Sequence, residues 1–231
     1  MGSIGGRSIK DEFGGALGPR TMNSETFGNA LVLSGRLRIN PNYRSGDSAY
    51  RRNCALESTA FALQARGYDV EAMPRDTQWR GFNSVFDVDY SNPENYVVNS
   101  SAVGISGVPH ARDIVRKYGA DKISIQDVPT MPRGAQAVAN KINERMNSWG
   151  ENSVAILNVK WKDTSGAHTV VVVNRLGGVS IVDPQSGRVE HNITSYLKRT
   201  IANHTSLVRV DNAPIKSNIK DLDKIVRRRK S

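Results

Sequence analysis

The hydrophobic pattern between Asn53 and Gly67 predicts a helix that is buried on nearly all sides. Its apolar residues recur at three- and four-residue steps and also spread around the helix axis; they are Ala55, Leu56, Ala60, Phe61, Ala62, Leu63 and Ala65. Asn53 belongs to the residue types that cap helix N-termini, and Gly67 to those that end helices. We therefore expect this segment in the core of the protein.

Other apolar patterns predict several helices followed by an antiparallel sheet. Helices are expected at residues 109–118, 132–149 and 192–200, and strands at 30–39, 68–72, 123–128, 154–161, 167–174, 179–183 and 206–210. The run from Thr169 to Val173 has apolar residues on both faces, which indicates a central strand. The predicted fold class is α+β.

Composition divides the chain into three parts. Residues 1–39 begin with a Gly-rich stretch without sustained periodicity, so we expect an extended arm followed by a strand. Residues 40–211 contain the remaining periodic segments and are expected to form one domain, and residues 212–231 form a basic tail. Within the domain, the polar connection from 75 to 107 is interpreted as a functional flap or as an insertion.

The composition also excludes several classes of protein. No apolar stretch is long enough to span a membrane, and the first residues lack the pattern of a signal peptide. The single cysteine, Cys54, excludes an intramolecular disulfide and a cysteine-based zinc cluster, and no His or carboxylate pair has metal-ligand spacing. We therefore expect no metal, no cofactor and no membrane contact, and a location in the cytoplasm or in a virion.

The net charge of +10 is concentrated near the end of the chain. Seven basic and two acidic residues follow residue 215, so about half of the excess positive charge belongs to the tail. The cluster of Arg227, Arg228, Arg229 and Lys230 is interpreted as a solvated end or as a contact with nucleic acid or another acidic partner. The tail lacks interleaved aromatic residues, so stacking on bases is not expected.

Cys54 is the candidate nucleophile because it lies in the first turn of the predicted buried helix. There the helix dipole and the free backbone N–H groups favour a thiolate over a thiol. A thiol nucleophile needs a base within hydrogen-bond distance and a third group that orients the base. A cysteine in a helix is by itself more often a small buried apolar residue, so its partners decide the interpretation.

His168 and Asp183 are the candidate partners of this thiol. Of the four histidines, only His168 lies at the start of a predicted core strand, and Asp183 ends the following strand. A carboxylate near an imidazole accepts its Nδ1–H and leaves Nε2 available as a base. Gln185 is an alternative orienting group, or a donor to an oxyanion.

The loop between these two strands determines whether the pair meets. If the loop spans residues 175–178, Asn174 faces Val179, and the imidazole and the carboxylate share one face with about 7–8 Å between their backbones. A two-residue turn at 177–178 keeps the face but separates them further. A three-residue loop places them on opposite faces of the sheet.

Short motifs that include these residues follow one another along the chain: Asn40-Pro41-Asn42-Tyr43, Asn53-Cys54, Arg66-Gly67-Tyr68-Asp69-Val70-Glu71-Ala72-Met73-Pro74, Trp161, Gly166-Ala167-His168 and Asp183-Pro184-Gln185. In this order they resemble the papain-fold toxin domain, which is described as a glutamine deamidase. That family occurs in polymorphic toxins and at the ends of phage minor head proteins. The resemblance covers roughly residues 40–211, although 75–107 match poorly, and it implies a papain-like fold in which a buried N-terminal helix packs on an antiparallel sheet.

The resemblance also implies roles for individual residues. Cys54 would be the nucleophile, His168 the base and Asp183 the orienting acid. The oxyanion would be bound by the backbone N–H of Cys54 and by one further donor. Substrate or oxyanion contacts are assigned to Gln185 and Asn53, and Asn42 is another candidate donor.

Two positions depart from the family pattern. Many members have a second cysteine three residues after the first, where this chain has Glu57. An aromatic residue often follows the family histidine, and here Val170 and Val171 take its place. Both departures leave the three catalytic residues intact and affect the expected substrate pocket.

The implied function is cysteine-dependent hydrolysis of a side-chain amide, with protein glutamine as the substrate and a thioester intermediate. Transfer to an amine would make the same site a transglutaminase, and peptide cleavage would make it a protease. The alternative is a phage head or virion protein that uses the papain-like module with or without activity. The expected partners are therefore a protein substrate and virion head proteins, and delivery into a target cell is the other expected location.

Overall fold

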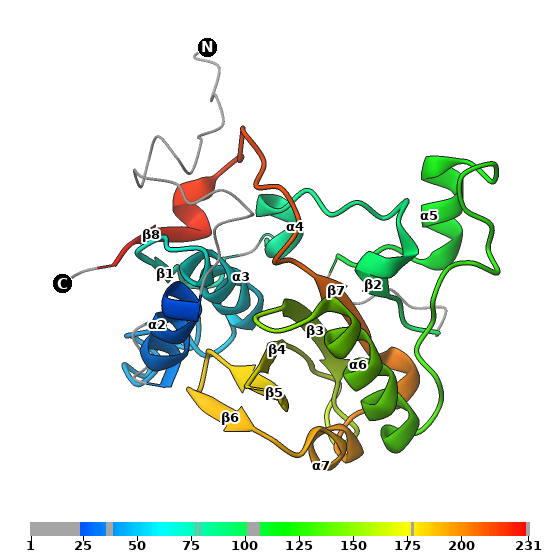
Figure 1. Cartoon of the computed structure of the whole chain (residues 1–231). Coiled ribbons are helices and arrows are strands. Elements are labelled where there is room, and N and C mark those ends of the chain that lie inside the picture. The colour runs from blue at the N-terminus through cyan, green and yellow to red at the C-terminus, as the bar shows by residue number, and fades with distance from the viewer. Residues whose placement is uncertain are drawn as a thin grey trace. The chain divides into compact units, whose positions relative to one another are not determined.

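The structure is a computed structural model that describes residues 24–35, 39–76, 78, 80–100, 107–176 and 178–229 (Figure 1). The chain divides into two compact units. The first comprises Met1–Asp87, Asp183–Arg188 and Val210–Ser231, and the second comprises Val88–Val182 and Val189–Arg209. Most of the predicted Gly-rich arm lies outside the described residues, and the predicted boundaries at 39 and 211 stay a prediction. No helix in the described part of the chain is long and apolar enough to cross a membrane.

The first unit is built around the predicted buried helix. Its elements are α2 (Ser24–Gly35), α3 (Cys54–Ala65), β1 (Val70–Ala72), α4 (Phe82–Val85), η3 (Leu222–Lys224) and β8 (Val226–Arg228). Helix α3 contacts α2, β1 and α4, and every residue from Leu56 to Ala65 is buried. Gly67, with φ at 89°, takes the left-handed conformation that follows a helix end. The prediction of a buried helix is confirmed.

The strand predicted for residues 30–39 is wrong where the structure describes it. Residues up to Gly35 belong to α2, which packs on α3. The alternation of apolar residues suggested a strand, but Phe27, Ala30 and Ser34 are the side chains that become buried. Their three- and four-residue spacing places them on one helix face, and this face has a partner only in the folded chain.

Arg66 joins the end of α3 to the last part of the chain. Its side chain is fully buried, and its Nη2 donates to the backbone carbonyls of Val210 and Ala213, the second at 2.7 Å. The guanidinium carbon lies 4.7 Å from the centroid of the Phe86 ring. Burial lowers the pKa of Arg66 to about 10, and the negative charge of Asp211 partly offsets this shift. The side chain therefore fixes two distant segments at a desolvation cost.

Replacing Arg66 with Met is expected to lower the free energy of unfolding by about 1–2 kcal/mol. Methionine fills a similar volume and removes the buried charge, but two carbonyl groups lose their donor. Denaturant unfolding of the full chain measures the change. An effect above about 4 kcal/mol would show that the charge itself stabilises the fold, contrary to this account.

The basic tail is not simply a solvated end. Strand β8 pairs antiparallel with β1, and Glu71 lies opposite Arg227. Arg227 Nε donates to Glu71 Oε1 at 2.6 Å, and Arg229 Nε donates to Asp69 Oδ1 at 2.7 Å. Two of the four cations assigned to a nucleic-acid contact are thus paired within the chain, and this weakens the case for that contact.

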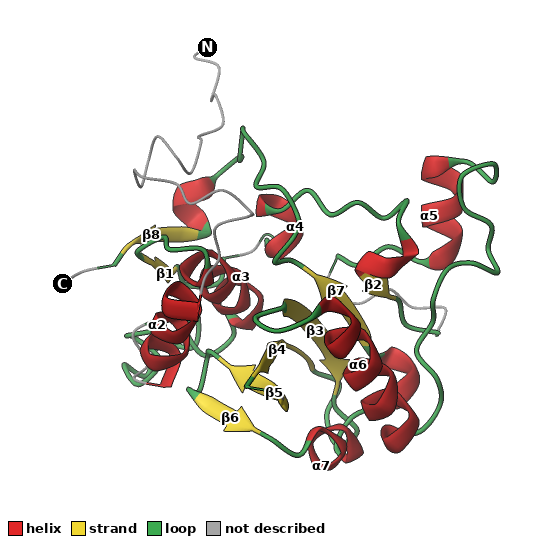
Figure 2. Ribbon diagram, in the orientation of Figure 1, coloured by secondary structure: helices red, strands yellow, loops and turns green. Residues whose placement is uncertain are grey.

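The second unit contains a six-stranded sheet (Figure 2). Its elements are η1 (Pro93–Asn95), β2 (Tyr96–Val97), α5 (Ala111–Tyr118), α6 (Ala135–Trp149), β3 (Val154–Lys160), β4 (Ala167–Arg175), β5 (Gly178–Asp183), β6 (Arg188–Glu190), α7 (Ile193–Lys198), η2 (Ala202–His204) and β7 (Ser206–Arg209). The strand order is β2-β7-β3-β4-β5-β6. Strand β4 is central and buried, as predicted. Its residues form one apolar cluster with those of α6, including Val138, Ile142 and Met146.

Two predictions concern polar segments, and the interpretation of residues 75–107 as a flap or an insertion stays a prediction. The connection from 75 to 107 contributes β2, the edge strand that pairs with β7. The strand predicted for 123–128 is wrong, because the segment forms turns. Ser124 Oγ donates to Asp127 Oδ2 at 2.6 Å, and Asp127 N donates to Ser124 O at 3.1 Å. These local bonds satisfy groups that a strand would offer to a neighbour.

The β4–β5 hairpin has the register of the first predicted alternative. Asn174 lies opposite Val179, and pairing continues to Arg175 opposite Gly178, so the other two loop alternatives are wrong. Leu176 follows β4 with φ at 53°, a left-handed conformation that is costly for leucine, and its side chain is 85% exposed. The turn therefore carries local strain without compensating burial.

Replacing Leu176 with Asn is expected to raise the free energy of unfolding by about 0.5–1 kcal/mol. Asparagine tolerates the left-handed conformation, and no packing is lost at this exposed position. Thermal or denaturant unfolding measures the effect. The matched control is Val189→Asn, which changes an exposed apolar side chain in β6 and is expected to give no gain.

Candidate active site

Cys54 is the first residue of α3 and its side chain is half-buried. The backbone carbonyl of Asn53 accepts the N–H groups of Leu56 at 2.8 Å and of Glu57 at 3.0 Å, which starts the helix directly before the thiol. The sulfur therefore belongs to the helix end where the dipole favours negative charge. The predicted place of Cys54 at the start of a buried helix is confirmed.

The side chain of Asn53 does not cap the helix, contrary to its residue type. Its Nδ2 donates to Glu57 Oε1 at 2.7 Å and to the carbonyl of Met73 at 3.0 Å. Its Oδ1 accepts from Asn40 Nδ2 at 3.2 Å and from Gln185 Nε2 at 3.1 Å. Buried polar groups must be paired, and these four bonds meet that need better than one cap would. The residue before the thiol thus joins four segments of the first unit.

Asp183 and Gln185 are held by a turn within the same unit. Asp183 Oδ1 accepts from the backbone N–H of Gln185 at 3.1 Å, and Oδ2 accepts from Ser186 Oγ at 2.6 Å. The carbonyl of Asp183 accepts from Gly187 N at 2.8 Å. A short acidic side chain that bonds the following backbone stabilises such turns. The turn fixes the Asp183 carboxylate and directs the Gln185 amide to Asn53.

Glu57 adds a carboxyl group that is fully buried beside the start of α3. Burial raises the pKa of Glu57 well above its ordinary value, and the hydrogen bond from Asn53 acts in the opposite direction. The negative charges of Asp183, Cys54 and Glu71 raise the pKa further. Among the described residues, Oε2 of Glu57 has no hydrogen-bond partner. The surroundings therefore favour the neutral, protonated form of this carboxyl group.

His168 belongs to the second unit, where it is the second residue of β4 and lies opposite Val159 of β3. Its ring stacks on Trp161, with 5.7 Å between the ring centroids and 26° between the planes. Trp161 also contacts the ring of Tyr196 at 5.6 Å and the guanidinium of Arg199 at 5.6 Å. A rigid central strand and an aromatic neighbour thus restrict the orientation of the imidazole.

Two of the other three histidines, His110 and His191, have local contacts of their own. His191 Nδ1 lies 2.8 Å from Ser180 Oγ, and the carbonyl of His110 accepts the N–H groups of Asp113 and Ile114 in α5. No group of His, Cys, Asp and Glu side chains among the described residues has the arrangement of a metal site.

The structure brings Cys54, Asn53, Asp183 and Gln185 together in the first unit, where hydrogen bonds link Asn53 to Gln185 and Gln185 to Asp183. Sequence patterns miss Glu57 as part of this network and mark it only as the place of a second family cysteine. A carboxyl group within an otherwise uncharged, buried helix is the signal that points to it. Asn40 is marked as part of a family motif, but its bond to Asn53 depends on the folded chain.

A cysteine at the end of a buried helix, a carboxylate in a strand-end turn and an antiparallel sheet with a histidine on its central strand place this protein in the papain-like α+β class. A family model described as papain fold toxin 1, glutamine deamidase, matches residues 52–188, which is more than half of the chain. The chain belongs to this family of papain-fold toxins, and the predicted family and fold class are confirmed. No curated protein and no solved structure matches it.

Proposed function

We propose that this protein deamidates glutamine side chains of a protein substrate in a target cell, with Cys54 as nucleophile, His168 as base and Asp183 as the group that orients His168. The observation that carries the proposal is the link between the thiol-bearing helix end and the turn of Asp183 and Gln185 through the buried Asn53 side chain. Membership in the deamidase family supports the same chemistry.

In the proposed reaction, His168 takes the proton of the thiol, and the sulfur attacks the amide carbon of the substrate glutamine. The C–N bond breaks, the imidazolium gives its proton to the departing nitrogen, and ammonia and a thioester result. A water molecule, deprotonated by His168, then attacks the thioester. The products are glutamate and the regenerated thiol, so no cofactor is consumed.

The oxyanion formed in each step needs hydrogen-bond donors. We assign the backbone N–H of Cys54 and one N–H of the Gln185 amide, whose other N–H is donated to Asn53. Both N–H groups of the Asn53 amide are already donated, to Glu57 and Met73. Asn53 is therefore proposed to position its neighbours instead of binding the oxyanion.

The reaction is tested by incubating the full chain with a chemically unfolded, glutamine-rich protein. Ammonia is expected to appear in equal amount to new glutamate, as measured by mass spectrometry. A second sample contains a labelled primary amine, which reports transglutaminase activity if it is incorporated, and new peptide termini would report a protease. Amine incorporation or peptide cleavage in place of glutamate formation would contradict the proposal.

The alternative of a structural phage or virion protein relied on the N-terminal arm and the basic tail. The arm lies mostly outside the described residues, so its part in this alternative stays a prediction. The tail pairs with β1 through Val226–Arg228, and it therefore favours the alternative less than its charge suggested. Iodoacetamide separates the two functions, because Cys54 is the only thiol in the chain. Rapid alkylation of the folded protein at neutral pH favours the enzyme, whereas alkylation only after denaturation favours the structural module.

A further inference from the structure

Four basic residues lie close together where the segment around Trp161 meets the end of α7. They are Lys160, Lys162, Lys198 and Arg199, which we call the basic surface. Lys162, Lys198 and Arg199 are exposed, and Lys160 is half-buried. Among the described residues, none of the four forms an ion pair, in contrast to Lys141 and Arg145 of the same unit, which pair with Glu144 and Glu94.

Backbone hydrogen bonds hold the basic surface together. The N–H of Lys162 donates to the carbonyl of Arg199 at 3.0 Å, and the N–H of Ile201 donates to the carbonyl of Lys160 at 2.8 Å. Lys162 Nζ donates to the carbonyl of Lys198 at 2.8 Å, so one ammonium group lies at the end of α7. The two segments that supply the cations are therefore fixed against each other, unlike basic residues scattered over a solvated face.

The segment from Lys160 to Lys162 lies beside His168. Lys160 lies opposite Ala167, the neighbour of His168 on β4. Trp161, between two of the lysines, stacks on the imidazole, and the guanidinium of Arg199 lies 5.6 Å from the centroid of the indole. Asp163 is the only acidic residue between Lys160 and His168. The result is an excess of positive charge within a few residues of the proposed catalytic base.

We infer that the basic surface binds an acidic segment of the protein substrate next to the glutamine that is deamidated. This inference rests on the proposed function, because a substrate must pass His168 for the surface to matter. Carboxylates of the substrate would form ion pairs with these cations, as Glu144 and Glu94 do with Lys141 and Arg145 elsewhere in the unit. The indole of Trp161 already contacts His168, Tyr196 and Arg199. These contacts favour a role of Trp161 in positioning Arg199 over a role in stacking on a nucleic-acid base.

The test uses three synthetic peptides that share one central glutamine and differ in their flanking residues, which are glutamates, serines or lysines. The full chain is expected to deamidate the glutamate peptide with the highest kcat/KM, by about tenfold over the serine peptide at low salt, and to lose most of this preference at high salt. Ammonia release measures the rate, and the Cys54→Ser variant gives the background.

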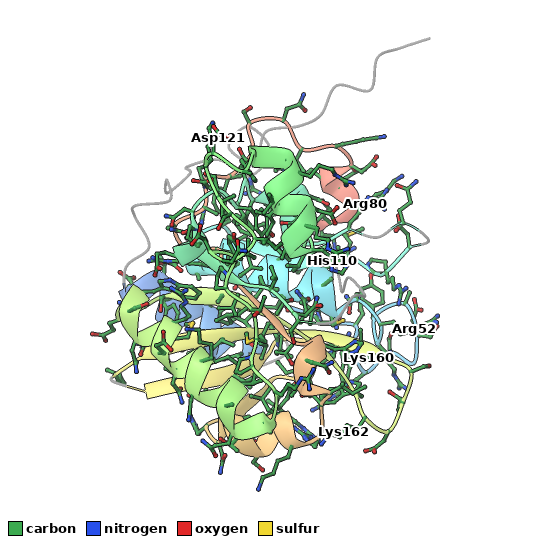
Figure 3. All side chains as sticks on the ribbon, turned by 90° about the vertical axis from the view of Figure 1, so that its right-hand side faces the viewer. Arg52, Arg80, His110, Asp121, Lys160 and Lys162 are labelled. Carbon is green, nitrogen blue, oxygen red and sulfur yellow. The ribbon has the colours of Figure 1, made fainter. Side chains whose placement is uncertain are left out.

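The surface itself is tested by a triple variant, Lys160→Gln, Lys162→Gln and Lys198→Gln. The matched control removes three exposed cations from the region of α5, through Arg112→Gln, Lys117→Gln and Lys122→Gln. Figure 3 shows Asp121, the neighbour of Lys122, at the opposite end of the second unit from Lys160 and Lys162. The first variant is expected to reduce kcat/KM for the glutamate peptide about tenfold with less than twofold change for the serine peptide, and the control is expected to leave both unchanged.

Binding distinguishes failure of this inference from failure of the proposed function. Anisotropy of the labelled peptides is measured with Cys54→Ala, so that it does not depend on catalysis, and unfolding curves confirm that each variant is folded. If no peptide releases ammonia but the glutamate peptide binds through the three lysines, the proposed reaction is wrong and the acidic-ligand site stands. Equal binding of all three peptides overturns the site. Binding of a labelled single-stranded DNA through the same lysines, without peptide binding, replaces the inference with a nucleic-acid site.

Discussion

Replacement of Cys54 by Ser is expected to lower kcat/KM for deamidation by about 10⁴-fold or more, because the thiolate that forms the thioester is lost. Replacement of His168 by Ala is expected to cause a loss of the same order, since the thiol then has no base. The double variant should fall no further than either single variant, because residues that act as one unit have non-additive effects. Ammonia release from a glutamine peptide measures all three rates.

Iodoacetamide gives a second measurement that does not depend on the substrate. In the parent protein, Cys54 is expected to react rapidly at neutral pH, and His168→Ala should slow this reaction while the unfolding curve stays the same. His191→Ala is the matched control, since His191 contacts Ser180 and lies outside the proposed mechanism. Equal alkylation rates in the parent and in His168→Ala would remove His168 from the mechanism.

Replacement of Glu57 by Ala is expected to lower the free energy of unfolding by about 2–4 kcal/mol, because it creates a cavity and leaves a buried N–H of Asn53 without its acceptor. Glu57→Gln keeps an acceptor of the same shape and should be tolerated. Denaturant unfolding at several pH values measures both effects. Glu151→Gln, at an exposed turn, is the control for the loss of a carboxylate.

The free energy of unfolding is also expected to depend differently on pH in the parent and in Glu57→Gln. Burial raises the pKa of Glu57 in the folded protein, so its contribution to stability is fully present below the ordinary carboxyl pKa and is lost as the pH rises through the raised pKa. Glu57→Gln cannot ionise and should lack this loss. Relative to the parent, its free energy of unfolding is therefore expected to increase with pH. A constant difference between the two proteins across this range would show that Glu57 is not protonated in the folded state.

Glu57 is also linked to the reactivity of the thiol. The charges of Cys54 and Asp183 raise its pKa, and by the same interaction an ionised Glu57 would disfavour the thiolate. Alkylation of Cys54 should therefore remain rapid to higher pH in Glu57→Gln than in the parent. A merely structural role of Glu57 would change stability without moving the pH profile of alkylation.

Much of the fold follows from local patterns. Helices α3 and α6 and the strands β3, β4 and β5 are rich enough in apolar residues that neighbouring residues predict them. The same patterns failed at residues 30–35 and 123–128. In the first segment a helix face is buried by α3, and in the second Ser124 and Asp127 satisfy the backbone locally. Local periodicity says which side chains share a face, but it does not say whether that face finds a partner.

By itself, the sequence determined the order of the chemical groups: a thiol at a helix start, an imidazole on a core strand and a carboxylate at a strand end. Only the tertiary structure decided what surrounds Asn53 and in which direction the pKa of Glu57 is shifted. Both depend on residues far apart in the chain, since Asn40, Met73 and Gln185 reach Asn53 only after folding. Hydrogen bonding and desolvation are properties of the complete packed environment, and no local stretch of sequence contains that environment.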